Sequence, residues 1–593
     1  MVEERSEIDD EHKWSIENMF SSEEEWREEV EEIRQDMEKL SEFEGEVTDS
    51  ASDLKEVLEL KNDISRRLES VKKFAHMKRD QDTRNQDAQA MLSQAKSLGT
   101  DFSRETSFIV PEIVEAGQGR IREFLEMEEE LEDYEHFFDD IFRMKNHILE
   151  SDQEEILSSL GDVNDAAQET YSTFTNADLT FPEIEDPEGE KVEITQSNFV
   201  KMQKHQDRGY RKRSFEALYD RFGEFRNTVT TTLSKQVRKN VRMAEIKNFD
   251  TARRAALKPD NIPVEVYDNL VDTVNDNVDL LQRLVELKKK ELGVDELKMY
   301  DLYMPVAESE SPDISYQEAK EHILEALQPL DEDYVEKVRE GLEEEKWVDI
   351  YENKGKRSGA YSGGSYDSRP FILMNYQDDI NSMYTLIHEL GHSMHSHHTN
   401  QNQPYHYSNY TIFQAEVAST TNEALLTRHL LETVEDENFR KHVLSHVIEG
   451  FRGTLFRQTM FSEFEKWLHE EVENGEALTP DKLNEKYGEL KQHYYQNAEI
   501  GERIRREWMR IPHFYYNFYV FQYATGISAG NMFAEKIVEE GPEDYRDFLR
   551  AGGSEYSLKT LQEAGVDLRS TEPVEEAIST FEKHLEQMEK LVD

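Results

Sequence analysis

The segment His388-Glu389-Leu390-Gly391-His392 constrains this chain more than any other, because its histidines can act together only on a helix. A helix turns about 100° per residue, so side chains four positions apart project from one face. Apolar residues recur at helical intervals around the segment, and residues 380–399 contain no proline, which predicts a helix there. The two imidazoles can then bind one metal ion, and Glu389 beside them can act as general base on a water molecule.

A catalytic zinc ion usually has three protein ligands and one position left for water. His398 stands where a metzincin has its third histidine, but His395 occupies the place of the glycine at which that pattern ends the helix. In a continuous helix His398 would lie about 15 Å along the axis from His388, too far to share a metal. Glu416, on a second amphipathic segment, is the better candidate, because glutamate is the third ligand of thermolysin-type enzymes.

Glu423 lies seven residues beyond Glu416 and falls on the same helical face, two turns away. We expect its carboxylate to accept the outer ring N–H of a liganding histidine, which fixes the tautomer and the ring orientation. A second histidine pair, His442 and His446, has the same spacing. A valine follows His442, whereas a glutamate follows His388. We expect that second pair to be structural or exposed.

Three short motifs follow one another along the chain: His388-Glu389-Leu390-Gly391-His392-Ser393-Met394-His395, Phe413-Gln414-Ala415-Glu416-Val417-Ala418-Ser419-Thr420 and Asn422-Glu423. Together they resemble the thimet oligopeptidase and oligoendopeptidase F family of zinc metallopeptidases, and the oligoendopeptidase F branch most. The resemblance extends over nearly the whole chain. It implies one Zn²⁺ per chain, bound by His388, His392 and Glu416, with Glu389 catalytic.

The same resemblance implies a fold and a substrate class. We expect a mostly α-helical, zincin-type fold with a small β-sheet near the active site and a deep substrate channel between two helical halves. The expected activity is hydrolysis of internal peptide bonds in short unstructured peptides. There are two alternatives for the function: a carboxypeptidase on the same scaffold, and a non-enzymatic acidic helical protein with a structural metal. The metal has alternatives as well, because cobalt or manganese could bind to the same ligands.

Glycines and a short apolar run precede the metal-binding segment. Within residues 351–376, several glycines are followed by Phe371-Ile372-Leu373-Met374, which predicts a strand at the edge of a sheet. A peptide can add its own backbone to such an edge. The expected pairing residues are Ser358, Gly359 and Ala360, and a flexible loop is the alternative reading of the same glycines.

An aromatic segment follows Pro512 near the C-terminus. On a helix that starts at this proline, Tyr516, Tyr519 and Tyr523 would fall within about 60° of one another and present a stripe of phenol donors. Such donors can stabilise the oxyanion of a tetrahedral intermediate, although aromatic stripes more often belong to a core. The resemblance implies that His513, Tyr516 and Tyr523 contact the substrate, and we expect Tyr519 to bind it as well.

The charge of the chain bears on its partners. With 128 acidic and 70 basic residues the net charge is −58, which repels nucleic acid and anionic membrane surfaces, so we expect neither as a partner. Hydrophobic residues make up 36% of the chain and can supply a core, which argues against disorder. We predict a halophilic protein, because about 1 M salt shortens the Debye length to about 3 Å and screens self-repulsion. An ordinary acidic protein is the alternative.

Three further features concern location and organisation. The chain has no cysteine, so nitrogen and oxygen atoms must hold any metal. It has no apolar N-terminal signal region and no apolar run of about 18 residues, so we expect a cytoplasmic protein, with a monomer favoured. A hairpin with strands at 179–182 and 191–194 is expected to close an N-terminal helical domain of residues 1–197, and residues 198–593 are expected to form the catalytic domain.

Overall fold

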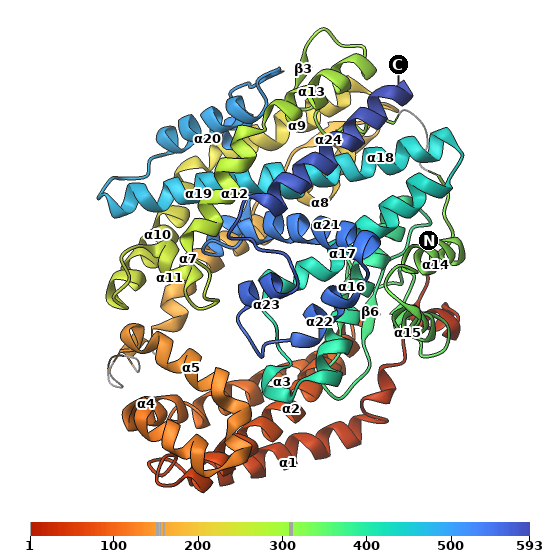
Figure 1. Ribbon diagram of the computed structural model, residues 1–593. Helices are drawn as coiled ribbons and strands as arrows, with labels where there is room; N and C mark the ends of the chain where they lie inside the picture. The colour runs from red at the N-terminus through yellow and green to blue at the C-terminus, as the bar shows by residue number, and fades with distance from the viewer. Residues whose placement is uncertain (1, 150–152, 154–155, 158–159, 308–311, 593) are drawn as a thin grey trace. The chain divides into compact units, whose positions relative to one another are not determined.

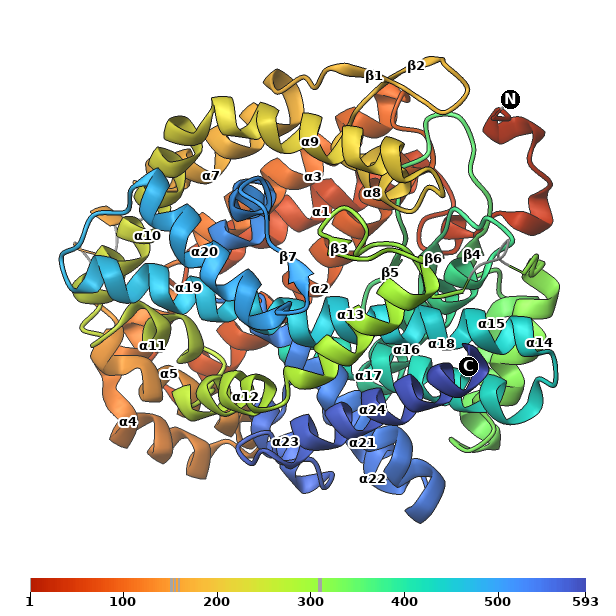
Figure 2. The same cartoon turned by 90° about the horizontal axis from the view of Figure 1, so that it is seen from above.

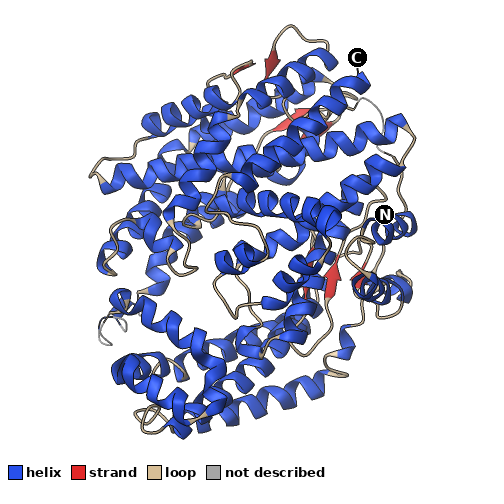
Figure 3. Ribbon diagram, viewed as in Figure 1, coloured by secondary structure: helices blue, strands red, loops and turns tan. Residues whose placement is uncertain are grey.

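The computed structural model describes residues 2–149, 153, 156–157, 160–307 and 312–592. The chain divides into two compact units, each built from three separate stretches. Unit 1 comprises Met1–Asn146, Pro312–Glu432 and Phe533–Gly565, and unit 2 comprises His147–Ser311, Thr433–Met532 and Val566–Asp593. Helices dominate both units, with a few short strands (Figure 3), so the prediction of a mostly helical fold with small sheets is confirmed. The units interleave along the sequence, and the single boundary expected at residue 197 stays a prediction.

The N-terminal stretch of unit 1 is helical (Figure 1). Its elements are the short 3-10 helices η1 (Arg5–Glu7), η2 (Asp10–His12) and η3 (Ile16–Asn18), the helices α1 (Glu23–Ser41), α2 (Ala51–Gln81), α3 (Gln86–Glu105), α4 (Ile109–Met127) and α5 (Glu135–Met144), and the 3-10 helices η4 (Glu129–Tyr134) and η5 (Lys145–His147). The side chain of Ser22 caps α1 by accepting the N–H of Glu25. Helices α1, α2 and α3 pack together through buried side chains such as Trp26, Val30 and Leu54.

The remaining stretches of unit 1 carry the predicted metal-binding motifs. Their elements are α14 (Tyr316–Ala326), α15 (Glu332–Glu343), β4 (Val348–Asp349), β5 (Tyr361–Gly363), β6 (Phe371–Leu373), α16 (Ile380–Asn402), η7 (Tyr405–Tyr407), α17 (Ile412–Thr433), α22 (Glu543–Ala551) and α23 (Ser557–Glu563). Helix α21 (Phe521–Glu540) begins in unit 2, and its residues from Phe533 on belong to unit 1.

The three-stranded sheet of unit 1 has the order β4-β6-β5. The apolar run forms strand β6, which is central and fully buried, so the prediction that it lies at the edge of a sheet is wrong. It pairs with β4 in parallel and with β5 antiparallel, and β5, which contains Gly363, lies at an edge. Strands β5 and β6 also pack against α16 (Figure 2), where the hydroxyl oxygens of Ser362 and Ser393 lie 2.8 Å apart. The sheet therefore supports the helix that carries the two histidines.

Unit 2 consists mainly of helices around a separate core. Its elements are α7 (Gly161–Thr173), the π-helical turn η6 (Phe174–Asp178), β1 (Glu183–Glu185), β2 (Lys191–Glu193), α8 (Gln196–Gln203), α9 (Arg208–Glu224), α10 (Arg226–Ile246), α11 (Ala252–Leu257), α12 (Val264–Asp276), α13 (Asp279–Glu291), β3 (Leu297–Lys298), α18 (Glu437–Phe451), the π-helical turn η8 (Arg452–Phe456), α19 (Arg457–Glu473), α20 (Pro480–Tyr494), β7 (Ala498–Glu499), η9 (Ile504–Arg510), η10 (Pro512–Tyr515) and α24 (Glu572–Val592).

The expected hairpin is present in unit 2, but its first strand is shifted. Strand β1 covers Glu183–Glu185, after the predicted residues 179–182, and β2 lies where it was expected. The side chains of Leu179 and Phe181 are buried, so their apolar character reflects core packing outside a strand. The carboxylate of Asp186 closes the turn by accepting the N–H groups of Glu188 and Glu190.

None of the helices in the described part of the chain combines the length and the apolar character that a membrane-crossing helix needs.

Candidate active site

Helix α16 presents the two histidines from one face. Its first turn is capped by Asp379, which accepts the N–H of Ser382 at 2.8 Å. The helix continues without interruption past His398, as predicted. One turn apart, His388 and His392 bring their Nε2 atoms to 3.2 Å from each other. Two ligands at about 2.1 Å from a tetrahedral metal would lie about 3.4 Å apart, so the pair has the spacing that a zinc ion requires.

Helix α17 brings the third donor to the same place. The Oε2 atom of Glu416 lies 3.9 Å from Nε2 of His388, and each of the three predicted ligands offers one donor atom within 4.8 Å of the others. Two nitrogens and one carboxylate oxygen form a donor set that suits zinc and leaves a coordination position for water. The chain's own residues therefore fit the metal that the resemblance implies.

A glycine sets the distance between the two helices. A Cβ atom on Gly391 would lie 2.6 Å from Cα of Ser419 and 2.7 Å from the carbonyl oxygen of Ala418, both on α17. The backbones of α16 and α17 thus approach closely at a point between the two histidines and about one turn after Glu416. A larger residue would separate the helices, because the atoms that it meets belong to rigid backbone. Sequence reasoning did not single out this glycine, although its position inside the motif was the available signal.

Glu423 occupies the expected place. Its Oε1 atom lies 2.5 Å from Nδ1 of His388, so the imidazole can donate through Nδ1 and present Nε2 to a metal. Burial alone would lower the pKa of His388, but the hydrogen bond and the charge of Glu423 raise it to about 9. Burial and the charge of His388 lower the pKa of His392 to about 3.

Glu389 lines a cavity within unit 1. This cavity has a volume of about 940 Å³ and is also lined by His388, His392 and Glu416. That volume lies near the upper end of the usual range for small-molecule sites, which is room for a short peptide segment. The side chain of Glu389 is almost fully buried, and burial raises its pKa. A raised pKa makes a carboxylate a stronger proton acceptor, as a general base requires.

Strand β5 forms one wall of this cavity. Ala360, Tyr361, Ser362 and Gly363 line it, and the last three also line a second cavity of about 730 Å³ beside α2 and α3. Ser358 and Gly359 lie in an exposed bend before the strand, where Gly359 has a φ of +87°. The edge strand thus starts at Tyr361, just after the residues predicted to pair with substrate.

The aromatic segment after Pro512 belongs to unit 2, and the prediction of a continuous helix there is wrong. Residues 512–515 form the short helix η10, residues 516–520 are a loop, and α21 starts at Phe521. The buried carboxylate of Glu465 accepts the N–H of Phe518 at 2.7 Å, and Phe518 has a φ of +59°. This buried hydrogen bond stabilises a backbone conformation that a helix cannot adopt.

The loop nevertheless gathers the four predicted side chains. The ring of His513 lies 5.6 Å from that of Tyr516, 6.2 Å from that of Tyr519 and 6.0 Å from that of Tyr523, centroid to centroid. Tyr516 is 44% exposed, and burial lowers the pKa of His513, which favours its neutral form. Their arrangement comes from the loop and not from helical periodicity.

The histidines that were not expected to bind the metal make other contacts. His398 stacks on Tyr334 with ring centroids 5.8 Å apart, and His395 stacks on Tyr410 at 3.7 Å. His442 is a buried residue of α18 in unit 2, which agrees with a structural role. Asn422 on α17, part of the third motif, is also buried, and its side-chain amide hydrogen-bonds to the hydroxyl of Tyr334, a contact that the sequence did not predict.

On this helical scaffold, an H-E-x-x-H helix facing a glutamate of a neighbouring helix defines the class as metallopeptidase. Comparison with known proteins narrows this class. The family model described as Peptidase family M3 matches residues 201–580, and the one described as Oligopeptidase F matches residues 112–181. The chain belongs to peptidase family M3.

Its relatives cover the chain from end to end. Oligopeptidase PepF of Bacillus subtilis (strain 168) is 44% identical over 592 residues, which are 99% of this chain and 88% of that protein. Group B oligopeptidase PepB of Streptococcus agalactiae serotype III (strain NEM316) is 42% identical over 596 residues, 100% of this chain and 99% of that one. The crystal structure of oligoendopeptidase-F from Enterococcus faecium superposes with a TM-score of 0.76 at 36% identity, covering 96% of this chain and 99% of the other.

Proposed function

We propose that this family M3 peptidase is a zinc-dependent oligoendopeptidase with one catalytic Zn²⁺ bound by His388, His392 and Glu416. The observation that supports it most is the 3.2 Å separation of the two histidine Nε2 atoms beside the carboxylate of Glu416. Glu389 is the general base in this proposal. When bound, the zinc ion supplies Lewis-acid chemistry, polarising the scissile carbonyl and favouring deprotonation of a water molecule.

The residues around the metal site transfer the proton and hold the ligands in place. The carboxylate of Glu389 takes the proton from the attacking water and later delivers it to the nitrogen of the departing amine. Glu423 holds His388 through Nδ1, so that Nε2 keeps its direction while charge develops nearby. Because Glu389 is buried, its charge acts in a water-poor setting, where electrostatic interactions are stronger.

The substrate is a short unstructured peptide in this proposal. Its backbone adds to the edge of the small sheet at Ser358, Gly359 and Ala360 and continues along β5. The support is that β5 has an edge position and lines cavities on two sides. Backbone pairing reads little side-chain information, so one enzyme can accept many peptide sequences. A proline at Ala360 should raise KM for all peptides, and an unchanged KM would favour a plain loop.

The aromatic loop supplies further substrate contacts in this proposal. Tyr523 or Tyr516, together with His513, stabilises the oxyanion, and Tyr519 binds the substrate. The support is the resemblance to the family and the close grouping of the four rings. Phenylalanine at Tyr516 or Tyr523 removes only the hydroxyl, so kcat should fall while KM changes little if that hydroxyl meets the transition state.

The setting of the enzyme is also proposed. We infer a halophilic peptidase without nucleic-acid or membrane partners, on the strength of its net charge of −58. A cytoplasmic location and a monomeric state stay predictions on which the charge does not bear.

One experiment tests the proposed function as a whole. An internally quenched peptide is incubated with the enzyme, with the chelated enzyme, and with the chelated enzyme after zinc is added back; the products are then identified by mass. Internal cleavage that disappears on chelation and returns with zinc is expected. Release of residues only from the C-terminus would instead indicate a carboxypeptidase, and cleavage that resists chelation would contradict a metal mechanism.

A further inference from the structure

A second group of metal-binding side chains lies in unit 1. Two groups of at least three His, Asp or Glu side chains have mutually close donor atoms within the described ranges, and one of them is the candidate active site. The other consists of His322, Glu325 and His429, with one donor atom from each residue within 4.8 Å of the others. Neither the expected catalytic mechanism nor the sequence motifs use these three residues.

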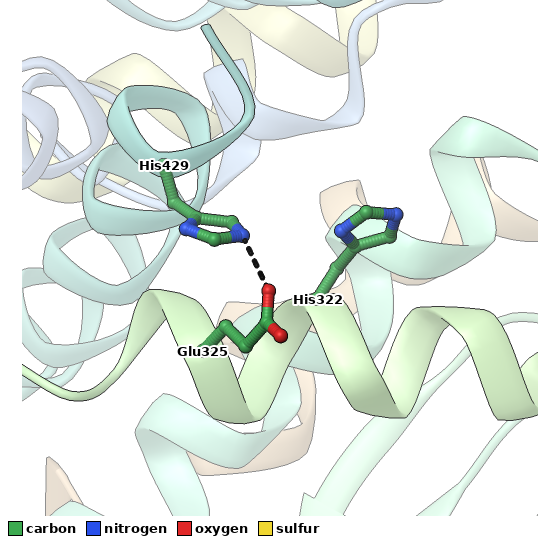
Figure 4. A group of neighbouring side chains, drawn as sticks. All are labelled: His322, Glu325 and His429. Carbon is green, nitrogen blue, oxygen red and sulfur yellow. Dashed lines mark ion pairs between the residues drawn. The ribbon is translucent and has the colours of Figure 1, made fainter. Parts of the chain in front are cut away.

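Two helices supply the three side chains. His322 and Glu325 are three residues apart on α14, so they project from the same face, and His429 comes from α17 (Figure 4). Figure 4 shows both α14 side chains on the side of the helix toward His429, whose ring reaches the carboxylate of Glu325. The Nε2 atom of His429 lies 3.3 Å from Oε2 of Glu325, and the rings of His322 and His429 have centroids 6.1 Å apart.

The backbone beneath the group is fixed by core packing. Ile323 and Leu324 beside His322 are buried, as are Leu426 and Leu430 on either side of His429 along α17. The carboxylate of Glu325 is 69% exposed and can therefore turn at little cost. Ligands of a tetrahedral zinc ion lie about 3.4 Å apart, so movements of about 1 Å would bring these donors into position.

The charges around the group favour a cation. Arg428, the cationic neighbour of His429, pairs with Glu432 and Glu535, so its charge is largely offset. Two imidazoles and a carboxylate are the ligands preferred by zinc and by similar divalent transition metals, and magnesium or calcium would require more oxygen donors.

We propose that His322, Glu325 and His429 form a second, structural metal site for a divalent transition metal such as Zn²⁺. The bound ion connects α14 to α17, the helix that carries Glu423 about 9 Å and Glu416 about 20 Å further back along its axis. Metal binding thereby stabilises the folded state of unit 1, because a ligand that binds only the folded chain shifts the folding equilibrium. The site is separate from the catalytic one and does not depend on the proposed function.

Zinc stoichiometry tests this site. The full chain is dialysed against zinc-buffered solution, and the bound metal is measured for the wild type, for H322Q/H429Q, for H388Q/H392Q and for the quadruple variant. We expect two, one, one and zero equivalents. Equal binding by the wild type and H322Q/H429Q would overturn the second site. Retention of two equivalents by H388Q/H392Q would instead count against the proposed catalytic site, so the two failures are distinguishable.

A milder pair of variants guards against misfolding. Glu325→Gln changes an exposed side chain. Glu321→Gln on the same helix is the matched control, because the Glu321 carboxylate accepts a hydrogen bond from Gln317 and does not belong to the metal-binding group. In the H388Q/H392Q background, zinc should raise the Tm, E325Q should remove that rise, and E321Q should keep it. Zinc binding without any rise in Tm would contradict the structural role. A rise that E325Q leaves intact would contradict the ligand assignment.

Discussion

Glu389 on α16 and Glu507 in η9 are both buried glutamates, and their neighbours differ in charge. Burial raises the pKa of Glu389, the charge of His388 lowers it, and the charges of Glu416 and Glu423 raise it further. Glu507 contacts Lys491 at 2.6 Å, Arg457 at 2.9 Å and the hydroxyl of Tyr487 at 2.6 Å. Burial alone would raise its pKa too, but the charges of Lys491 and Arg457 hold it well below its usual range.

The difference separates two uses of a buried carboxylate. A glutamate that is compensated by cations and a hydroxyl is locked in one protonation state, so it can hold α19, α20 and η9 together but cannot exchange protons. A glutamate whose pKa is raised in a cavity accepts a proton more readily than a free carboxylate, which is the behaviour that a general base needs. Burial by itself therefore does not fix the direction in which the pKa of a glutamate shifts, and the charges around the carboxylate do.

The largest expected effect follows from replacing Glu389. Glu389→Gln should reduce kcat about 10²- to 10⁴-fold, because an amide cannot accept the proton from water. Its stability should stay equal or increase, since a folded-state pKa raised above the unfolded value means that the charged carboxylate opposes folding at neutral pH. Steady-state kinetics, zinc analysis and thermal unfolding check this. Retained activity would contradict the role of Glu389 as general base, and loss of zinc together with activity would show that Glu389 is needed for metal binding.

Glu507→Gln should have the opposite signature. Removing this charge leaves Arg457 and Lys491 without their buried anion, which should cost about 3–5 kcal/mol of unfolding free energy. The depressed pKa means that the wild type holds this stability above the ordinary glutamate pKa of about 4.3 and loses it as the pH falls toward the folded value. Denaturant unfolding between pH 3 and 7 should therefore show a smaller acid dependence for E507Q. A change in kcat without a change in stability would contradict a structural role.

Gly391→Ala probes the space between the helices that form the candidate site. The added Cβ meets the backbone of Ser419 and Ala418, so we expect a loss of about 1–3 kcal/mol in unfolding free energy, with weaker zinc binding because Glu416 moves with α17. Gly450→Ala on α18 is the control, because its Cβ would have no neighbour within 4 Å. That control should be neutral or slightly stabilising. Equal behaviour of the two variants would show that α16 and α17 can separate freely.

Glu423→Gln tests the partner of His388. An amide retains the shape but not the charge, so zinc affinity should fall about 10- to 100-fold while the fold is retained. Competition with a chelator of known affinity measures this change. Glu432→Gln on the same helix serves as a control when both variants carry H322Q/H429Q, since Glu432 pairs with Arg428 at the surface and only the catalytic ligands are then expected to bind zinc. An unchanged affinity in E423Q would reduce Glu423 to an ordinary helix-face glutamate.

The exposed carboxylates are each expected to have the smallest effect on stability. Their mutual repulsion at a net charge of −58 should be screened by salt, so the Tm should rise steadily as KCl increases toward molar concentrations. The E507Q variant should rise in parallel, because its change is buried and poorly reached by ions. A Tm that is flat or falls with KCl would remove the halophilic proposal.

The sequence by itself determined the features that depend on near neighbours in the chain. Helical periodicity predicted that His388 and His392 share a face and that the helix continues past His398. The seven-residue spacing put Glu416 and Glu423 on one side of α17, where both reach His388. Such features can be read from sequence, because the rise and the rotation per residue of a helix are fixed by the backbone.

Only the tertiary structure decided the features that depend on distant parts of the chain. The carboxylate of Glu465, more than fifty residues earlier, holds Phe518 in a loop where periodicity predicted a helix. The approach of α17 gives Gly391 its role, and the pairing of α14 with α17 brings His429 to His322 and Glu325. Each of these contacts joins segments whose separation in the sequence carries no periodic signal, and packing energy outweighs local preference where the two disagree.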